Sequence, residues 1–101
     1  MLAIFSDSFM EKSDNMITEL EKKEKKSMIE DTIKTRKLYE QFKASIRERV
    51  ERERAMENRS SDSYRLTKML YAVMGFCHQQ ILECYDQERR LKEELYEIER
   101  G

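Results

Sequence analysis

The stretch Glu57-Asn58-Arg59-Ser60-Ser61-Asp62 is the one polar break in a chain of 101 residues that has no proline and has glycine only at positions 75 and 101. Proline and glycine are the residues that most often interrupt a helix, so little else in the chain forces the backbone out of helical geometry. The sequence therefore predicts a single all-α domain: one helix over residues 8–57, a turn at 58–62 and a second helix over 63–100.

The ends of the two helices carry recognisable capping residues. Ser8-Phe9-Met10-Glu11 fits the capping box, in which a serine oxygen and a glutamate side chain satisfy free amide groups at a helix start. Ser60, Ser61 and Asp62 are candidate caps for the second helix. We therefore expect an antiparallel hairpin that folds back near Ser60.

The second helix has the clearer apolar pattern. Its residues recur at alternating spacings of four and three, which is the heptad seam of a coiled coil: Leu70, Met74, Cys77, Ile81, Cys84, Glu88, Leu91, Leu95 and Ile98. In the first helix the apolar residues form two groups separated by charged residues. The first group is Phe9, Met16, Ile17 and Leu20, and the second is Leu38, Tyr39, Phe42, Ile46 and Val50.

The fold-back near Ser60 predicts which residues face each other across the seam. Gly75 is expected to meet Ala44 and Ser45, so that the two helix axes approach closely where all the side chains are small. In the same register, Leu38 is expected beside Ile81, and Phe42 beside His78.

The second helix has more apolar residues than one seam can bury. Leu66, Met69, Tyr71, Val73, Phe76, Leu82 and Tyr85 fall outside the heptad positions. Burying a large apolar side chain contributes about 1.5–3 kcal/mol, so leaving such a face in water is unfavourable. We expect a partner, or a second copy, to complete a helical bundle. The predicted contact consists of Leu66, Met69, Val73 and Phe76, together with Phe9, Met16, Ile17 and Leu20 beyond the open end of the hairpin.

Glu88 is the one charged residue in the apolar seam, and a carboxylate there needs a cationic or donor partner. Within the hairpin it falls near Thr32, with Lys34, Arg36 and Lys37 in reach. A local pair is the first interpretation. The alternative is a charge that selects a partner helix, because isolated polar seam positions set register and partner choice, so Glu88 joins the predicted partner-binding residues.

Residues for catalysis or for cofactor or metal binding are scarce. His78 is the only histidine, and with Cys77 and Cys84 it does not make the four-ligand set of a structural zinc site. A bridge between the two cysteines is excluded, because seven helical residues separate their α-carbons by about 10 Å. An intermolecular disulfide stays open. We predict no catalytic residue, no metal, no cofactor and no small-molecule ligand.

Charge and hydropathy argue against two further classes of partner. Charged residues make up 41% of the chain, yet the formal net charge is −1. Glutamates interleave the lysines of 22–26 and the arginines of 47–54, which leaves no uncompensated basic face for nucleic acid. The longest apolar stretch, residues 66–82, is too short and too polar to span a bilayer. Met1-Leu-Ala-Ile-Phe5 lacks the basic leader and cleavage site of a secretory signal. We therefore expect a cytoplasmic protein.

Three segments give the chain an architectural resemblance to the small helical helper proteins of bacterial type VII secretion. They are Leu38-Tyr39-Glu40-Gln41-Phe42, the turn Ser60-Ser61-Asp62-Ser63, and the charged ending Glu88-Arg89-Arg90-Leu91-Lys92-Glu93-Glu94-Leu95-Tyr96. The chain resembles the Esx-like WXG proteins and, more closely, the partners of the helical N-terminal domain of LXG toxins. The resemblance implies a chaperone or targeting factor for a secreted toxin.

Several family signatures are absent. The chain has no tryptophan and its turn has no glycine. Tyr85 and Tyr96 are each followed four residues later by arginine instead of the acid of the export signature, and neither Phe5 nor Phe9 has an aspartate at that spacing. The resemblance then implies the partner class without its own export signal, exported if at all together with its partner.

The sequence thus leaves three hypotheses open, of which the interleaved charges disfavour the third. The first is a non-enzymatic helical adaptor, chaperone or targeting factor for a helical domain of a secreted protein. The second is a structural homodimer, a four-helix bundle. The third is a nucleic-acid-binding hairpin.

Overall fold

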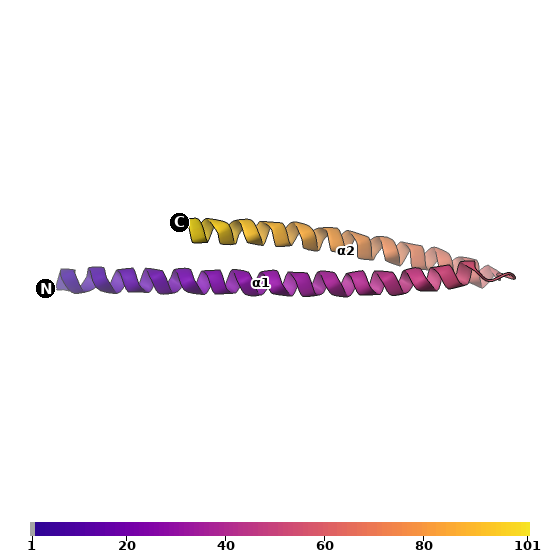
Figure 1. Ribbon diagram of the computed structural model, residues 1–101, viewed down its shortest axis with the longest axis horizontal. Coiled ribbons are helices and arrows are strands. Elements are labelled where there is room, and N and C mark those ends of the chain that lie inside the picture. The colour runs from indigo at the N-terminus through magenta and orange to yellow at the C-terminus, as the bar shows by residue number, and fades with distance from the viewer. Residues whose placement is uncertain (1) are drawn as a thin grey trace.

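The computed structural model describes the backbone of residues 2–101 and the side chains of residues 11–101. Two helices, α1 (Leu2–Arg54) and α2 (Ser61–Arg100), run antiparallel and side by side in a hairpin of 88 × 15 × 14 Å (Figure 1). The predicted all-α, coiled-coil-like hairpin is confirmed. With 53 residues against 40, α1 continues past the C-terminal end of α2.

The first helix begins earlier than predicted. Ser8 lies inside α1 instead of capping it, so the capping-box prediction is wrong. Residues 2–7 contain neither proline nor glycine, and a helix once formed adds further residues at low cost. The capping-box residues therefore do not mark the start of α1, because the helix continues upstream of them.

The connection between the helices lies at residues 55–60 instead of the predicted 58–62. The last turn of α1 tightens, with the Met56 amide donating to the carbonyl of Glu53 at 3.4 Å. Ser60 has extended backbone (φ −80°, ψ 166°), and its hydroxyl accepts the amide of Ser63 at 3.1 Å. The prediction of Ser60 as an N-cap is confirmed, and α2 starts at the next residue.

The predicted seam of α2 is the buried face of that helix. Cys77, Ile81, Cys84, Glu88 and Leu91 are buried, and the remaining predicted positions are half-buried. The centre of the apolar core is a cluster of Ile46, Val50 and Cys77, against which Tyr39, Leu70 and Met74 pack.

The seam of α1 is more polar than that of α2. Its buried and half-buried residues also recur at spacings of three and four: Ile29, Thr32, Arg36, Tyr39, Lys43, Ile46, Val50 and Glu53. Leu38 and Phe42 are not among them and are exposed, so the prediction that they face the seam is wrong. Both precede a seam position by one residue, which turns them to the side of the hairpin.

The predicted close approach of the helices at Gly75 is also wrong. A β-carbon built on Gly75 would meet no atom within 4 Å, and Ala44 and Ser45 are exposed. Gly75 follows the seam position Met74 by one residue, so it points away from α1. The small residues lie at matching heights on the two helices but outside the seam.

Candidate interaction surface

The heptad register divides the exposed surface of the hairpin into two sides. Residues that follow a seam position meet across the helices on one side: Tyr71 accepts from Arg54 at 3.0 Å, and Tyr85 donates to Glu40 at 3.3 Å. Residues that precede a seam position meet on the other side, where Met28, Thr35 and Gln87 line one groove. In an antiparallel helix pair, residues that follow a seam position on one helix lie beside residues that follow a seam position on the other, and residues that precede a seam position lie beside each other in the same way. The contacts above agree with this geometry.

The side that precedes the seam carries an apolar surface, which we call the side face. It consists of Leu38, Phe42, Leu66, Met69, Val73 and Phe76. Exposed fractions are 66% for Leu38, 54% for Phe42, 66% for Met69, 38% for Val73 and 58% for Phe76, while Leu66 is half-buried. Phe76 packs edge-on against Tyr39, with ring centroids 6.4 Å apart. The side face is therefore an apolar surface built from both helices.

The opposite side also carries large side chains, and there Tyr85 and Tyr71 have polar partners within the hairpin, while Leu82 and Tyr96 are exposed. The guanidinium of Arg36 lies over the Tyr85 ring at 4.4 Å from its centroid and donates to the Tyr85 hydroxyl at 3.1 Å. Arg54 holds the hydroxyl of Tyr71. Cation–π stacking and hydrogen bonds stabilise exposed tyrosines without a further protein. Tyr85 and Tyr71 therefore have polar partners within the hairpin, whereas the apolar side chains of the side face are open to solvent.

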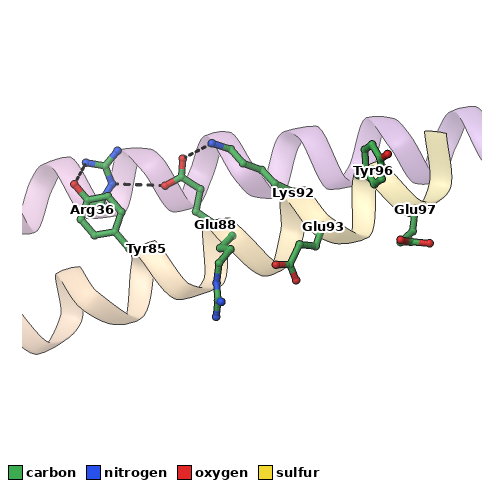
Figure 2. Close-up of a pocket in the computed structure, with 8 residues that line it drawn as sticks. Arg36, Tyr85, Glu88, Lys92, Glu93, Tyr96 and Glu97 are labelled. Carbon is green, nitrogen blue, oxygen red and sulfur yellow. Dashed lines mark hydrogen bonds and ion pairs between the residues drawn. The ribbon is translucent and has the colours of Figure 1, made fainter. Parts of the chain in front are cut away.

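A groove on the tyrosine side runs along the C-terminal half of α2 (Figure 2). It is open to solvent and lined by Arg36, Tyr85, Glu88, Arg89, Lys92, Glu93, Tyr96 and Glu97. Arg36 donates to Glu40 at 3.0 Å, and this hydrogen bond raises the pKa of Arg36 above its ordinary value, against the opposing effect of desolvation. The cations and carboxylates of the groove lie interspersed, which gives it no strong preference for the charge of a ligand.

Glu88 lies inside the hairpin. Its carboxylate is 3.0 Å from Lys92 and 3.9 Å from the Nε of Arg36 (Figure 2), and the side chain is buried. The sequence favoured a local pair with Lys34, Arg36 and Lys37 in reach, and the structure shows the pair with Arg36. Glu88 therefore lies mostly buried in the lining of this groove, and its predicted contact with a partner stays a prediction.

The other predicted contact residues fall into two places. Leu66, Met69, Val73 and Phe76 lie together on the side face. Lys25 binds Glu94 at 2.6 Å, which raises the pKa of Lys25; six residues further along each helix, residue 19 falls beside Arg100. Met16 and Ile17 thus extend past the end of α2, where they and Leu20 are exposed. The side chain of Phe9 lies outside the described residues.

A second buried polar cluster at the turn was missed from the sequence. Glu53 is buried and accepts from the Ser63 hydroxyl at 2.8 Å and from Arg49 at 3.1 Å. Arg59 donates to Thr67 at 2.8 Å. Continuing the spacing of three and four backwards from Leu70 reaches Thr67 and Ser63, and forwards from Val50 reaches Glu53. The periodicity could therefore have identified these three positions as part of the seam. It was overlooked because a search for apolar residues passes over polar ones.

No group of three or more histidine, cysteine, aspartate or glutamate side chains suited to a metal ion occurs among side chains 11–101. Within the described part of the chain, neither helix has an apolar stretch sufficient to cross a membrane. Cys77 and Cys84 are both buried as free thiols. Comparison with protein-family models, with curated proteins and with solved structures gave no match.

Proposed function

We propose that this chain is a non-enzymatic helical adaptor or chaperone that binds a helical domain of another protein through its side face. The observation that carries the proposal is the exposure of Leu38, Phe42, Met69, Val73 and Phe76 together on one side of the hairpin, where no third element among the described residues 2–101 covers them. A gathering of exposed large apolar side chains on one side of a protein is typical of an interaction site.

The shape of the surface favours a helix as the partner. The side face runs along both helices of the hairpin. An amphipathic helix packed against α1 and α2 would bury its apolar stripe there, as in helix-in-groove complexes. Each large apolar side chain removed from water contributes about 1.5–3 kcal/mol before the cost of association. The adaptor would then complete a bundle of three or more helices.

The resemblance to helper proteins of type VII secretion names a class of partner, the helical N-terminal domain of a secreted LXG toxin. In this proposal the hairpin covers that domain in the cytoplasm and accompanies it to the secretion machinery. The exposed Met16, Ile17 and Leu20 on the overhang of α1 extend the same contact beyond the hairpin.

Site-specific photocrosslinking in the native host tests the surface. We expect a photoreactive phenylalanine analogue at Phe42 to crosslink to a helical secreted protein, and the same analogue at the exposed Tyr96, on the other side, to crosslink far less. Phe42→Asp together with Val73→Asp should abolish the complex, while circular dichroism should show that the helical content of the variant is unchanged.

The rival arrangement closes the side faces of two copies on each other as a four-helix bundle. It predicts that the Phe42 crosslink joins two copies of this chain and nothing else. That result, or equal crosslinking from Phe42 and Tyr96, would reject the adaptor proposal.

A further inference from the structure

The outer face of α2, which points away from α1, is a second surface that the hairpin leaves open. Residues 69–82 contain no aspartate, glutamate, lysine or arginine, in a chain that is 41% charged. Within this stretch Ala72, Gly75 and Gln79 are exposed on the outer face, with Met69, Phe76 and Leu82 at its edges. A helix segment without charge on any face is normally covered on more than one side.

The charges at the two ends of this stretch have opposite signs. Arg65 and Lys68 lie at the end near the turn, while Glu83 and Asp86 lie at the far end. Arg65, Lys68 and Glu83 are exposed and Asp86 is partly exposed. Among the described residues, Lys68 and Glu83 make no ion pair. Asp86 already pairs with Arg89 and Arg90 on its own helix. The outer face is thus apolar in the middle and basic at the end near the turn, and Glu83 supplies the carboxylate without an ion pair among the described residues at the far end.

We infer that the outer face of α2 binds the same face of a second copy of this chain, with the two α2 helices antiparallel. Pairing centred between Gly75 and Phe76 brings Arg65 of each copy opposite Asp86 of the other. The same register places Lys68 at the height of Glu83 and, one turn further out, Asp62 at the height of Arg89, in each case diagonally across the interface. Charge complementarity of this kind selects the orientation and register of an interface and disfavours the parallel alternative.

The centre of the pairing is sterically open. A β-carbon on Gly75 would meet nothing within 4 Å in the isolated hairpin, and Ala72 is the other small residue on this face. Small residues let two helix axes approach closely, so the Phe76 ring of one copy can lie over Gly75 of the other. This gives the helix glycine a role that contact with α1 does not provide.

The two-fold symmetry of such a dimer also fixes where the side faces lie. An axis perpendicular to the plane of the paired α2 helices keeps corresponding flanks on the same side of the dimer. The side faces of both copies therefore point in the same direction and form one wider apolar surface. The inference does not depend on the proposed function, because the outer face would pair whether or not a partner covers the side faces.

Two charge-reversed variants test the register. One carries Arg65→Glu and Lys68→Glu, and the other carries Glu83→Lys and Asp86→Lys. Each variant alone places like charges opposite each other at both ends of the interface, so we expect its self-association to weaken at least about tenfold. An equimolar mixture places opposite charges at every pair and should restore dimers at the wild-type affinity.

Sedimentation equilibrium over about 1–100 µM measures both effects, and circular dichroism checks that each variant stays helical. A monomeric wild-type chain across this range would overturn the inference. Self-association of either variant at the wild-type affinity, or a mixture that stays monomeric, would overturn it as well. Phe42→Asp, on the side face, is the matched control and should dimerise normally; if it alone abolishes dimers, the side face is the self-association surface.

Discussion

α1 and α2 form one seam but fill it differently. α2 contributes mainly apolar side chains at spacings of three and four, with Glu88 as the charged exception. α1 contributes Thr32, Arg36, Lys43 and Glu53 beside its apolar residues, and leaves Leu38 and Phe42 outside. The apolar residues of α1 are therefore divided between the seam that holds the hairpin together and an external surface.

The largest expected effect separates these two uses within α1. Ile46 is 6% exposed in the central cluster, whereas Leu38 is 66% exposed. Ile46→Ala should lower the free energy of unfolding by about 2–4 kcal/mol, because it removes buried methyl groups and leaves a cavity. Leu38→Ala should change it by less than about 0.5 kcal/mol. Urea unfolding at low protein concentration measures both, and equal losses would contradict the assignment of the seam.

The contrast between the helices also explains what could be predicted from sequence. The seam of α2 was predictable because its apolar residues match one period, and Ser60 was predictable because a serine before an uninterrupted helix is a common cap. In α1 some large apolar residues are exposed, while Thr32 and Glu53 are buried beside Ile46 and Val50. Sorting by hydropathy therefore placed Leu38 and Phe42 in the seam and left Thr32 and Glu53 out of it.

The position of Glu53 shows why such seams resist prediction. A carboxylate is buried at low cost only when specific donors surround it. Arg49 lies one helical turn before Glu53 on α1, but the other donor, Ser63, becomes adjacent only after the chain has turned. The placement of Leu66, Met69, Val73 and Phe76 on one side of the hairpin followed from the sequence, and their contact with a partner stays a prediction. The α1 half of the side face was missed for the same reason that the seam of α1 was.

The second prediction concerns this polar end of the seam. Glu53→Ala should cost about 1.5–3 kcal/mol, because the Ser63 hydroxyl and the Arg49 guanidinium lose a charged acceptor. Glu48→Ala, on the exposed surface of the same helix, is the matched control and should be near neutral. Thermal unfolding followed at 222 nm compares them. A silent Glu53→Ala would show that the polar cluster does not hold the turn.

The third prediction concerns the one charged residue in the seam of α2. Replacing Arg36 and Glu88 together by methionine should be neutral or stabilising by about 1 kcal/mol, since well-packed apolar residues often match a buried ion pair. Either single change leaves the other charge partly buried without this partner, although Glu40 still holds Arg36 and Lys92 still holds Glu88. A double-mutant cycle should give a coupling energy of about 0.5–1 kcal/mol. Strict additivity would mean that the separation of 3.9 Å carries no interaction.

The smallest effect tests whether α2 keeps its glycine for the hairpin or for a second molecule. Gly75 has helical neighbours and open space at its β-carbon, so Gly75→Ala should stabilise the isolated hairpin by about 0.5–1 kcal/mol through the unfolded chain. Chemical denaturation at a concentration where the protein is monomeric measures this gain. A bulkier Gly75→Leu should keep the monomer folded but weaken self-association, because its side chain would occupy the space assigned to Phe76 of the second copy. Loss of monomer stability in Gly75→Ala would instead show that α1 approaches this position, and the open face of α2 would then have to be placed elsewhere.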